Sequence, residues 1–254
     1  MAEIRERVRV VFFDLDETLL DDDHCMRKAV ARTCATLGKR YPQIKPKILE
    51  STYLRVSSEL WTSYGSVPRT YSTGDSGGID IRLEVWSQAL TVYGLPNQDL
   101  AIEAVDLYSQ ERRAGYCLFP DVHEVLQALR QRYILGLISN GPVDTQREKV
   151  HVTGLGAYLH ILMISGELGV GKPDSGIFLK ALESAQVIPE EAIHIGDSLT
   201  SDVVGAKGVG MYAIWLNRKK VPKPKDAPSL DLEIHTLWDL VPLLSPLPFH
   251  NNNV

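Results

Sequence analysis

The stretch Val10-Val11-Phe12-Phe13-Asp14-Leu15-Asp16-Glu17-Thr18 decides the fold of this chain. Its first four residues are apolar, and such a run is typical of a strand buried on both faces of a parallel sheet. Two carboxylates and a hydroxyl follow at the strand's carboxyl end, where open α/β sheets bind ligands. Carboxylates this close repel each other unless a cation or a shared proton neutralises them. They therefore indicate a binding site, with an acidic turn capping a helix as the alternative.

The bulk composition excludes several classes of protein. The 254 residues suffice for one large α/β domain or a core with a smaller companion. The net charge of −5 argues against a nucleic-acid partner, because phosphate binding needs a concentrated basic face. Neither a secretory signal nor the roughly 20 apolar residues of a membrane span is present. Cys25, Cys34 and Cys117 lack zinc spacing and predict free thiols in a reducing, cytoplasmic compartment.

Residues 23–115 show mostly helical periodicity. One expected helix carries the following apolar residues close to a single face: Ile81, Val85, Trp86, Ala89, Leu90 and Tyr93. Further helices are expected at 27–38, 46–60 and 99–113, with a loop rich in Gly, Ser and Thr at 64–78. This region is therefore predicted to be an inserted α-helical domain.

Beyond residue 116 helix and strand alternate, which predicts βαβ crossovers. Strands are expected at 133–138, 160–164, 192–195 and 211–216, and helices at 122–132, 143–150, 175–185, 201–208 and 236–244. The predicted fold class is α/β: a doubly wound, mostly parallel, Rossmann-like core of residues 1–22 and 116–254. The helical domain, residues 23–115, interrupts this core after its first strand.

Polar residues follow each of the first four predicted strands. Because the carboxyl ends of parallel strands share one edge of a sheet, we expect these side chains to converge. Taken singly, they read as a turn, a surface lysine and a helix cap, whereas their joint placement favours a site. The predicted set is Asp14, Asp16, Ser139, Asn140, Gly141, Lys172, Asp197 and Asp202.

This set suits phosphoryl transfer. A carboxylate on Asp14 would attack phosphorus and form an aspartyl-phosphate. The carboxylates of Asp14, Asp197 and Asp202 suit Mg²⁺, which prefers oxygen ligands, and Lys172 adds a fixed positive charge. Asp16 would protonate the leaving oxygen and then activate water.

Phosphate oxygens need hydrogen-bond donors. Ser139 and the backbone amides near Asn140 and Gly141 are the expected donors, and Thr18 is a further predicted substrate contact. A second phosphate-binding pattern, Gly166–Lys172, approaches a P-loop, but Pro173 stands where that motif requires Ser or Thr. We therefore set the P-loop interpretation aside.

Four segments together resemble the signatures of the haloacid dehalogenase-like hydrolase superfamily. They are Asp14–Thr18, Ile138–Gly141, Gly171–Asp174 and Gly196–Asp202. The resemblance covers the whole core, and the helical insert stands where that superfamily places its cap. It implies that Asp14 is the nucleophile and Asp16 the acid/base, and that Ser139 and Lys172 bind and clamp the phosphate.

The resemblance also implies a magnesium site. Asp14, Asp197 and the backbone carbonyl of Asp16 would surround the ion, and Asp202 would either touch it or support its ligands. Asp16 separates branches of the superfamily, because dehalogenase members lack an aspartate there and need neither acid nor metal. Phosphonatase members carry a small residue at that position. The chain therefore resembles the phosphatases and phosphomutases.

The resulting prediction is a magnesium-dependent phosphomonoesterase that takes a small-molecule phosphate ester. A phosphomutase and a non-catalytic phosphate-binding regulator are the alternatives, and a homodimer is left open. Arg82 and Arg69 of the insert are candidate substrate contacts, since arginine suits a carboxylate or a second phosphate. Segments 140–149, 81–86 and 215–217 resemble one phosphatase of the superfamily, which favours sugar phosphates or nucleotides as substrates.

Overall fold

A computed structural model describes residues 2–65 and 77–244 of the chain. Six strands form one sheet in the order β3-β2-β1-β4-β5-β6, and every neighbouring pair is parallel. This order is that of a doubly wound sheet and confirms the predicted α/β class. The strands are β1 (Val10–Phe13), β2 (Ile134–Ser139), β3 (Ile161–Ile164), β4 (Ala192–Gly196), β5 (Tyr212–Leu216) and β6 (Leu232–Ile234).

Strand β1 lies at the centre of the sheet and positions the site. It pairs with β2 on one side and β4 on the other, so that Phe13 stands opposite Leu137 and Ile195. All four of its residues are buried, as the apolar run predicted. The chain therefore leaves β1 at Asp14 beside the carboxyl ends of β2 and β4, where the strand order reverses direction.

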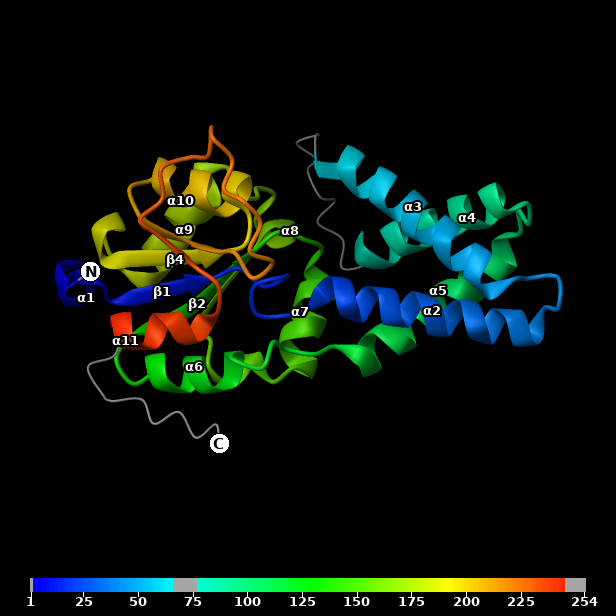
Figure 1. Ribbon diagram of the computed structural model, residues 1–254, viewed down its shortest axis with the longest axis horizontal. Helices are drawn as coiled ribbons and strands as arrows, with labels where there is room; N and C mark the ends of the chain where they lie inside the picture. The colour runs from blue at the N-terminus through cyan, green and yellow to red at the C-terminus, as the bar shows by residue number, and fades with distance from the viewer. Residues whose placement is uncertain (1, 66–76, 245–254) are drawn as a thin grey trace. The chain divides into compact units, whose positions relative to one another are not determined.

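Helices cover both faces of this sheet (Figure 1). On one face, α9 and α10 bury Phe178 and Ala206 against Phe12 and other apolar residues of the strands. On the other face lie α6 and α11, and the Tyr133 hydroxyl, beyond α6, donates to the Leu244 carbonyl of α11 at 2.7 Å. The elements are α1 (Ala2–Arg7), α6 (Val122–Leu129), η1 (Leu155–Ala157), α8 (Ser165–Leu168), α9 (Ser175–Ala185), η2 (Pro189–Glu191), η3 (Leu199–Val203), α10 (Val204–Gly208), η4 (Leu237–Leu240) and α11 (Val241–Leu244).

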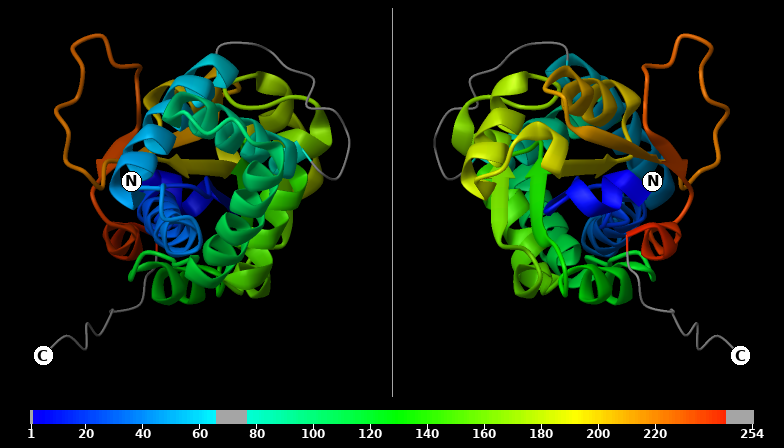
Figure 2. Two further views of the ribbon diagram at one scale, coloured as in Figure 1. Left: turned by 90° about the vertical axis from the view of Figure 1, so that its right-hand side faces the viewer. Right: turned by 90° about the vertical axis from the view of Figure 1, so that its left-hand side faces the viewer.

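Four long helices build a second compact unit. They are α2 (Asp22–Arg40), α3 (Pro46–Gly65), α4 (Gly77–Tyr93) and α5 (Gln98–Gly115). Helix α2 packs along α5, and α3 packs along α4 (Figure 2). The rings of Tyr53, Trp86 and Tyr108 meet in its core with centroids 4.3 to 6.0 Å apart. The predicted apolar face of α4 is confirmed, since Val85 and Trp86 are fully buried there.

The boundary between the two units differs from the sequence prediction. The core unit comprises residues 1–20, 118–140 and 154–254, and the helical unit comprises residues 21–117 and 141–153. Helix α7 (Val143–Val152), which we expected to belong to the core, packs with the helical unit. Ion pairs hold it there: Lys149 contacts Asp22 at 3.0 Å, and Glu148 accepts from Arg113.

Two local features also depart from the prediction. Strand β6 was missed, because its three residues are too short to give a hydrophobic period. The helix expected at 201–208 begins earlier, with the π-helical turn η3. The loop expected at 64–78 overlaps residues outside the described part of the chain. No described helix combines the length and the apolar character needed to cross a membrane.

Candidate active site

The loop after β1 is held tightly from both ends. The Asp14 amide donates to the Ile195 carbonyl at 2.8 Å, which fixes the main chain of Asp14 beside β4. The loop then turns back on itself, with Glu17 at φ 61° and its amide bonded to the Leu20 carbonyl at 2.8 Å. Arg218 donates to the Thr18 carbonyl at 2.9 Å. Asp14 and Asp16 therefore project from a main chain with little freedom.

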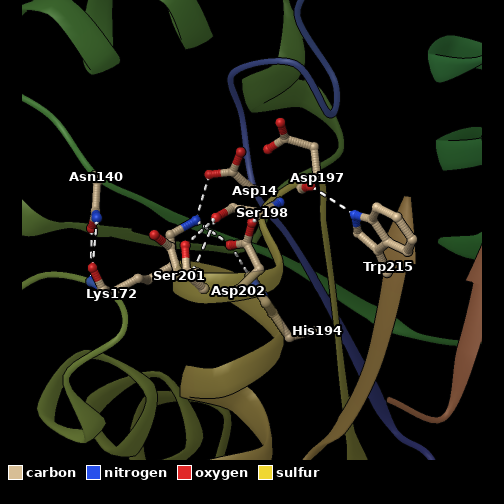
Figure 3. A network of polar contacts seen from close by, with 10 residues as sticks. Asp14, Asn140, Lys172, His194, Asp197, Ser198, Ser201, Asp202 and Trp215 are labelled. Atoms are coloured by element: carbon tan, nitrogen blue, oxygen red, sulfur yellow. Dashed lines mark hydrogen bonds and ion pairs between the residues drawn. The ribbon is translucent and has the colours of Figure 1, made fainter. Parts of the chain in front are cut away.

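Lys172 is the centre of a buried charge network (Figure 3). Its Nζ donates to Asp14 Oδ1 at 2.5 Å and to Asp202 Oδ1 at 2.6 Å. Its main chain is fixed by the Asn140 side chain, which accepts from the Lys172 amide at 2.8 Å and donates to the Lys172 carbonyl at 2.9 Å. Lys172, Asp14 and Asp202 are each at most 7% exposed. The ammonium group is thus held in one place at the carboxyl ends of the central strands.

Asp202 accepts hydrogen bonds on both of its carboxylate oxygens. Besides Lys172, the donors are His194 Nε2 at 2.8 Å and the Ser198 amide, which reaches Oδ2 at 3.0 Å. The wide turn of η3 contributes, because the amides of Asp202 and Val203 both donate to the Ser198 carbonyl. Gly196 leaves room for this side chain, since a Cβ there would lie 2.2 Å from Asp202 Cγ. These contacts favour Asp202 as the residue that positions Lys172.

The network carries more negative than positive charge. Ligand oxygens of Asp14, Asp197 and Asp202 lie within 4.8 Å of one another around a single lysine. Burial raises the pKa of Asp14 well above its usual range; Lys172 opposes this, and Asp202 and Asp197 reinforce it. Burial and the charge of Asp202 raise the pKa of Asp197 to about 7. A cluster that resists full ionisation in this way fits a hard divalent cation, because all its donors are oxygens.

Neighbouring groups determine the protonation states of Lys172, Asp202 and His194. Burial acts to lower the pKa of Lys172, but Asp14 and Asp202 outweigh it and raise that pKa. Burial acts to raise the pKa of Asp202, but Lys172 and His194 outweigh burial and lower that pKa. Burial lowers the pKa of His194, so a neutral ring donates from Nε2 to the ionised Asp202. Lys172 and Asp202 therefore form a charged pair, and Asp14 and Asp197 are the carboxyl groups whose ionisation the cluster opposes.

The structure brings together most of the residues predicted from the core sequence. Asp14, Lys172, Asp197 and Asp202 converge as expected, although they come from three separate segments. Ser139 ends β2 and is 1% exposed. Asp16 lies near enough that its charge raises the pKa of Asp14. The catalytic and metal-binding roles of these residues stay predictions.

The structure shows the surroundings of three predicted substrate contacts. The Asn140 side chain holds the main chain of Lys172, and the expected contact of the Asn140 backbone amide with phosphate stays a prediction. The Thr18 hydroxyl is fully buried and meets no partner among the described residues, so its geometry does not favour a substrate contact. Gly141, at φ 149°, opens the segment of the helical unit, and a Cβ there would lie 2.9 Å from Gln146.

The arginines proposed for substrate binding belong to the helical unit. Arg82 donates to the Ser109 hydroxyl at 3.2 Å, and its guanidinium lies 5.8 Å from the centre of the Tyr108 ring. These contacts lie within its own unit, and its substrate role stays a prediction. Arg69 lies outside the described residues.

Three supporting residues were missed by sequence reasoning. His194 and Ser198 hold Asp202, and Trp215 Nε1 donates to the Asp197 carbonyl at 2.8 Å (Figure 3). His194 was detectable, because a histidine within the buried run Ala192–Gly196 must find a polar partner. The contact of Trp215 could not be predicted, because a tryptophan near the end of a buried strand usually packs in the hydrophobic core.

Comparison with known proteins places these observations in a family. The profile described as haloacid dehalogenase-like hydrolase matches residues 8–210. The chain is 28% identical over 246 residues to N-acylneuraminate-9-phosphatase of Homo sapiens, with 95% of each chain covered. This is the phosphatase that segments 140–149, 81–86 and 215–217 resemble.

Two further relatives carry different activities in their names. Phosphoserine phosphatase of Thermus thermophilus is 32% identical over 249 residues, which cover 92% of this chain and 98% of that protein. The structure of 2-haloacid dehalogenase from Pseudomonas syringae pv. Tomato superposes with a TM-score of 0.67 at 29% identity, covering 93% and 97% of the two chains. From the family match, the shared fold and the converging aspartates and lysine, this chain belongs to the haloacid dehalogenase-like hydrolases.

Proposed function

We propose that this protein is a magnesium-dependent phosphomonoesterase that acts on a small phosphorylated metabolite through an aspartyl-phosphate. The observation that supports it most is the excess of carboxyl groups over cations, because Asp14, Asp197 and Asp202 share one fixed lysine and the pKa of Asp14 and of Asp197 is raised. Carboxylates this close repel one another unless a further cation neutralises them, so the cluster argues for a metal ion that binds there. The same observation argues against a non-catalytic regulator.

The ion would be held by oxygen donors of the core unit. Asp14 and Asp197 would supply carboxylates, and Asp16 would supply its backbone carbonyl, as the family resemblance implies. We assign Asp202 a supporting role, because its oxygens already accept from Lys172, His194 and Ser198. When bound, Mg²⁺ neutralises the phosphate and stabilises the charge that develops on its oxygens.

Asp14 is the proposed nucleophile. One of its carboxylate oxygens would attack phosphorus, and the bond from phosphorus to the ester oxygen would break. Lys172 lies 2.5 Å from Asp14 Oδ1 and would reduce the repulsion between the incoming phosphate and the carboxylate. Ser139 would hold a phosphate oxygen at the end of β2.

Asp16 is the proposed acid and base. An alkoxide leaving group needs a proton, which Asp16 would supply as the ester bond breaks. The resulting carboxylate would then take a proton from the water that hydrolyses the aspartyl-phosphate. A halide leaves without a proton, so an aspartate at this position favours phosphate esters over the haloacids named for the structural relative.

The names of the relatives indicate a general class of substrate. Their names include a phosphorylated sugar acid and a phosphorylated amino acid. Both are small anionic phosphomonoesters, and we propose that class here. Arg82 of the helical unit stays our candidate for a substrate anion.

The test is release of phosphate from p-nitrophenyl phosphate with and without MgCl₂, beside release of halide from 2-chloropropionate. We expect phosphate release that needs Mg²⁺ and no halide release. A panel of sugar phosphates, nucleotides and phosphoserine then ranks the substrates. Halide release, or the absence of turnover across the whole panel despite bound Mg²⁺, would contradict the proposal.

A further inference from the structure

Two cysteines that no step of the proposed reaction uses lie against each other. Cys25 Sγ and Cys117 Sγ are 3.0 Å apart, although 92 positions separate the two residues in the sequence. Cys25 is 1% exposed and belongs to the first turns of α2, whereas Cys117 follows α5 and is exposed. Both belong to the helical unit, and neither forms a disulfide in the structure.

The backbone around the two thiols is fixed by a single residue. The Asp21 amide donates to the Cys117 carbonyl at 3.1 Å, and the Asp21 carbonyl accepts from the Cys25 amide at 3.1 Å. The adjacent residues Leu20 and Leu118 form an antiparallel bridge. The two chain segments therefore run side by side, and an approach of about 1 Å would bring the sulfurs from this separation to the ~2.05 Å of a disulfide.

We propose that Cys25 and Cys117 form a reversible intramolecular disulfide when the protein meets a peroxide. The exposed Cys117 would react first: its sulfur attacks a peroxide oxygen, the O–O bond breaks, and Cys117 sulfenic acid and water form. The sulfur of Cys25 then attacks the sulfenic sulfur. The S–S bond forms, the S–O bond breaks, and a second water carries away the Cys25 proton.

The difference between the two thiols sets this order. Burial and the hydrogen bond to Cys117 raise the pKa of Cys25 to about 12, so Cys25 stays a protonated thiol until an electrophilic sulfur appears beside it. Peroxide meets Cys117 at the surface. The pair thus has the parts of a redox-sensitive site, an accessible thiol and a resolving thiol next to it.

A disulfide between Cys25 and Cys117 would link the beginning and the end of the chain segment 21–117. Asp21 is where the chain enters that unit, and Cys117 is where it leaves for the core unit. Cross-linking a loop of this length restricts the unfolded chain strongly. Oxidation is therefore expected to raise the midpoint of thermal unfolding, on the order of 5–10 °C.

The experiment treats the reduced, full-length protein with hydrogen peroxide, alkylates remaining thiols and digests with trypsin. We expect a linked pair of the peptides 10–27 and 114–130, which dithiothreitol separates, and an alkylated, unoxidised thiol in peptide 33–39, which holds Cys34. Thermal unfolding of the same samples should show the rise on oxidation and its reversal on reduction.

Two variants sharpen the result. Cys34→Ala removes the third thiol, which is buried in the core of the helical unit, and should still give the linked peptides. Cys25→Ser should stop at the sulfenic acid, which dimedone traps on peptide 114–130, and should show no thermal rise. Alkylation of both Cys25 and Cys117 after peroxide treatment, or oxidation of Cys117 to sulfinic acid without linkage, would overturn the proposal.

Discussion

The two units each contain a cluster of charges, and the proportion of carboxylates to cations is opposite in the two clusters. In the helical unit, one carboxylate, Asp22, lies between two cations, with Arg112 at 2.6 Å and Lys149 at 3.0 Å. In the core unit, one cation lies among three carboxylates. Burial acts to raise the pKa of Asp22, but Lys149 and Arg112 lower it to about 2, whereas the pKa values of Asp14 and Asp197 are raised.

The two clusters distinguish charges that hold a fold from charges that we propose to serve a reaction. Asp22 joins α2, α5 and α7, and each of its neighbours stabilises its ionised form. Asp14 pairs with Lys172, but the charges of Asp202 and Asp197 act against its ionised form. A surplus of closely spaced carboxylates is costly unless a cation compensates it, so it marks the place where we expect an ion and a substrate.

Asp14→Asn is expected to give the largest effect. Phosphatase turnover should fall by at least roughly 10⁴-fold, because an amide does not act as the nucleophile. Asparagine keeps an oxygen for Lys172 and removes one of the repelling charges, so folding should persist. The measurement is p-nitrophenyl phosphate hydrolysis, with circular dichroism as the test of folding and the exposed Asp226→Asn as the control. Retained turnover would exclude Asp14 as the nucleophile.

Lys172→Met tests the only cation of the core cluster among the described residues. Turnover should fall about 10²–10³-fold with the loss of a fixed positive charge at the phosphate. The free energy of unfolding should fall by about 3–5 kcal/mol, because Asp14 and Asp202 stay buried without their partner. Urea unfolding and steady-state kinetics measure the two effects.

The matched control for Lys172 is Lys207→Met. Lys207 pairs with Asp231 at 2.9 Å, but both side chains are about a quarter or more exposed. Such a pair contributes only about 0–1 kcal/mol. Equal losses of stability in the two variants would show that the core cluster is no more than an ordinary ion pair.

Asp22→Asn separates the two clusters most clearly. It leaves Arg112 and Lys149 buried without a carboxylate, so the free energy of unfolding should fall by about 3 kcal/mol. Turnover per folded molecule at low temperature should stay close to that of the unchanged protein, because Asp22 serves the fold of the helical unit. Urea unfolding and p-nitrophenyl phosphate hydrolysis on the same sample check both statements. A loss of turnover as large as that of Lys172→Met would end the distinction between structural and reactive charge.

The pH dependence of metal stabilisation is the smallest effect. An aspartate whose folded pKa is about 7 holds a proton that the unfolded chain releases near pH 4, so metal-free stability falls as pH rises between these values. Mg²⁺ relieves this loss by replacing the proton. The rise in thermal midpoint on adding MgCl₂ should therefore be a few degrees larger at pH 8 than at pH 5. An equal rise at both values would place the ion elsewhere.

The sequence predicted the sheet and the convergence of its charged residues well, because both depend on local patterns. The buried run ending in Asp14, and the polar residues after β2 and β4, are visible without any structure. The side-chain partners of Asn140 and Asp202 were not visible, because the partner of a side chain depends on packing between distant segments. The sequence did not indicate that the Asn140 side chain holds the main chain of Lys172.

The boundary between the units shows the same limit. Helix α7 follows a core strand in the sequence, and the alternation of strand and helix placed it in the core. Its ion pairs with Asp22 and Arg113 join it to helices that begin or end far away in the chain. The periodicity of α7 alone carries no information on which unit it packs with.

The binding of Mn²⁺, a spectroscopic substitute for Mg²⁺, tests the central claim most directly. Electron paramagnetic resonance counts the free ion as it is titrated into the protein, into Asp197→Asn and into Asp22→Asn. We predict one tight site in the unchanged protein and in Asp22→Asn, and its loss in Asp197→Asn. Undiminished binding in Asp197→Asn, or no binding in the unchanged protein, would contradict the account that the carboxylate surplus of the core unit exists to hold a divalent cation.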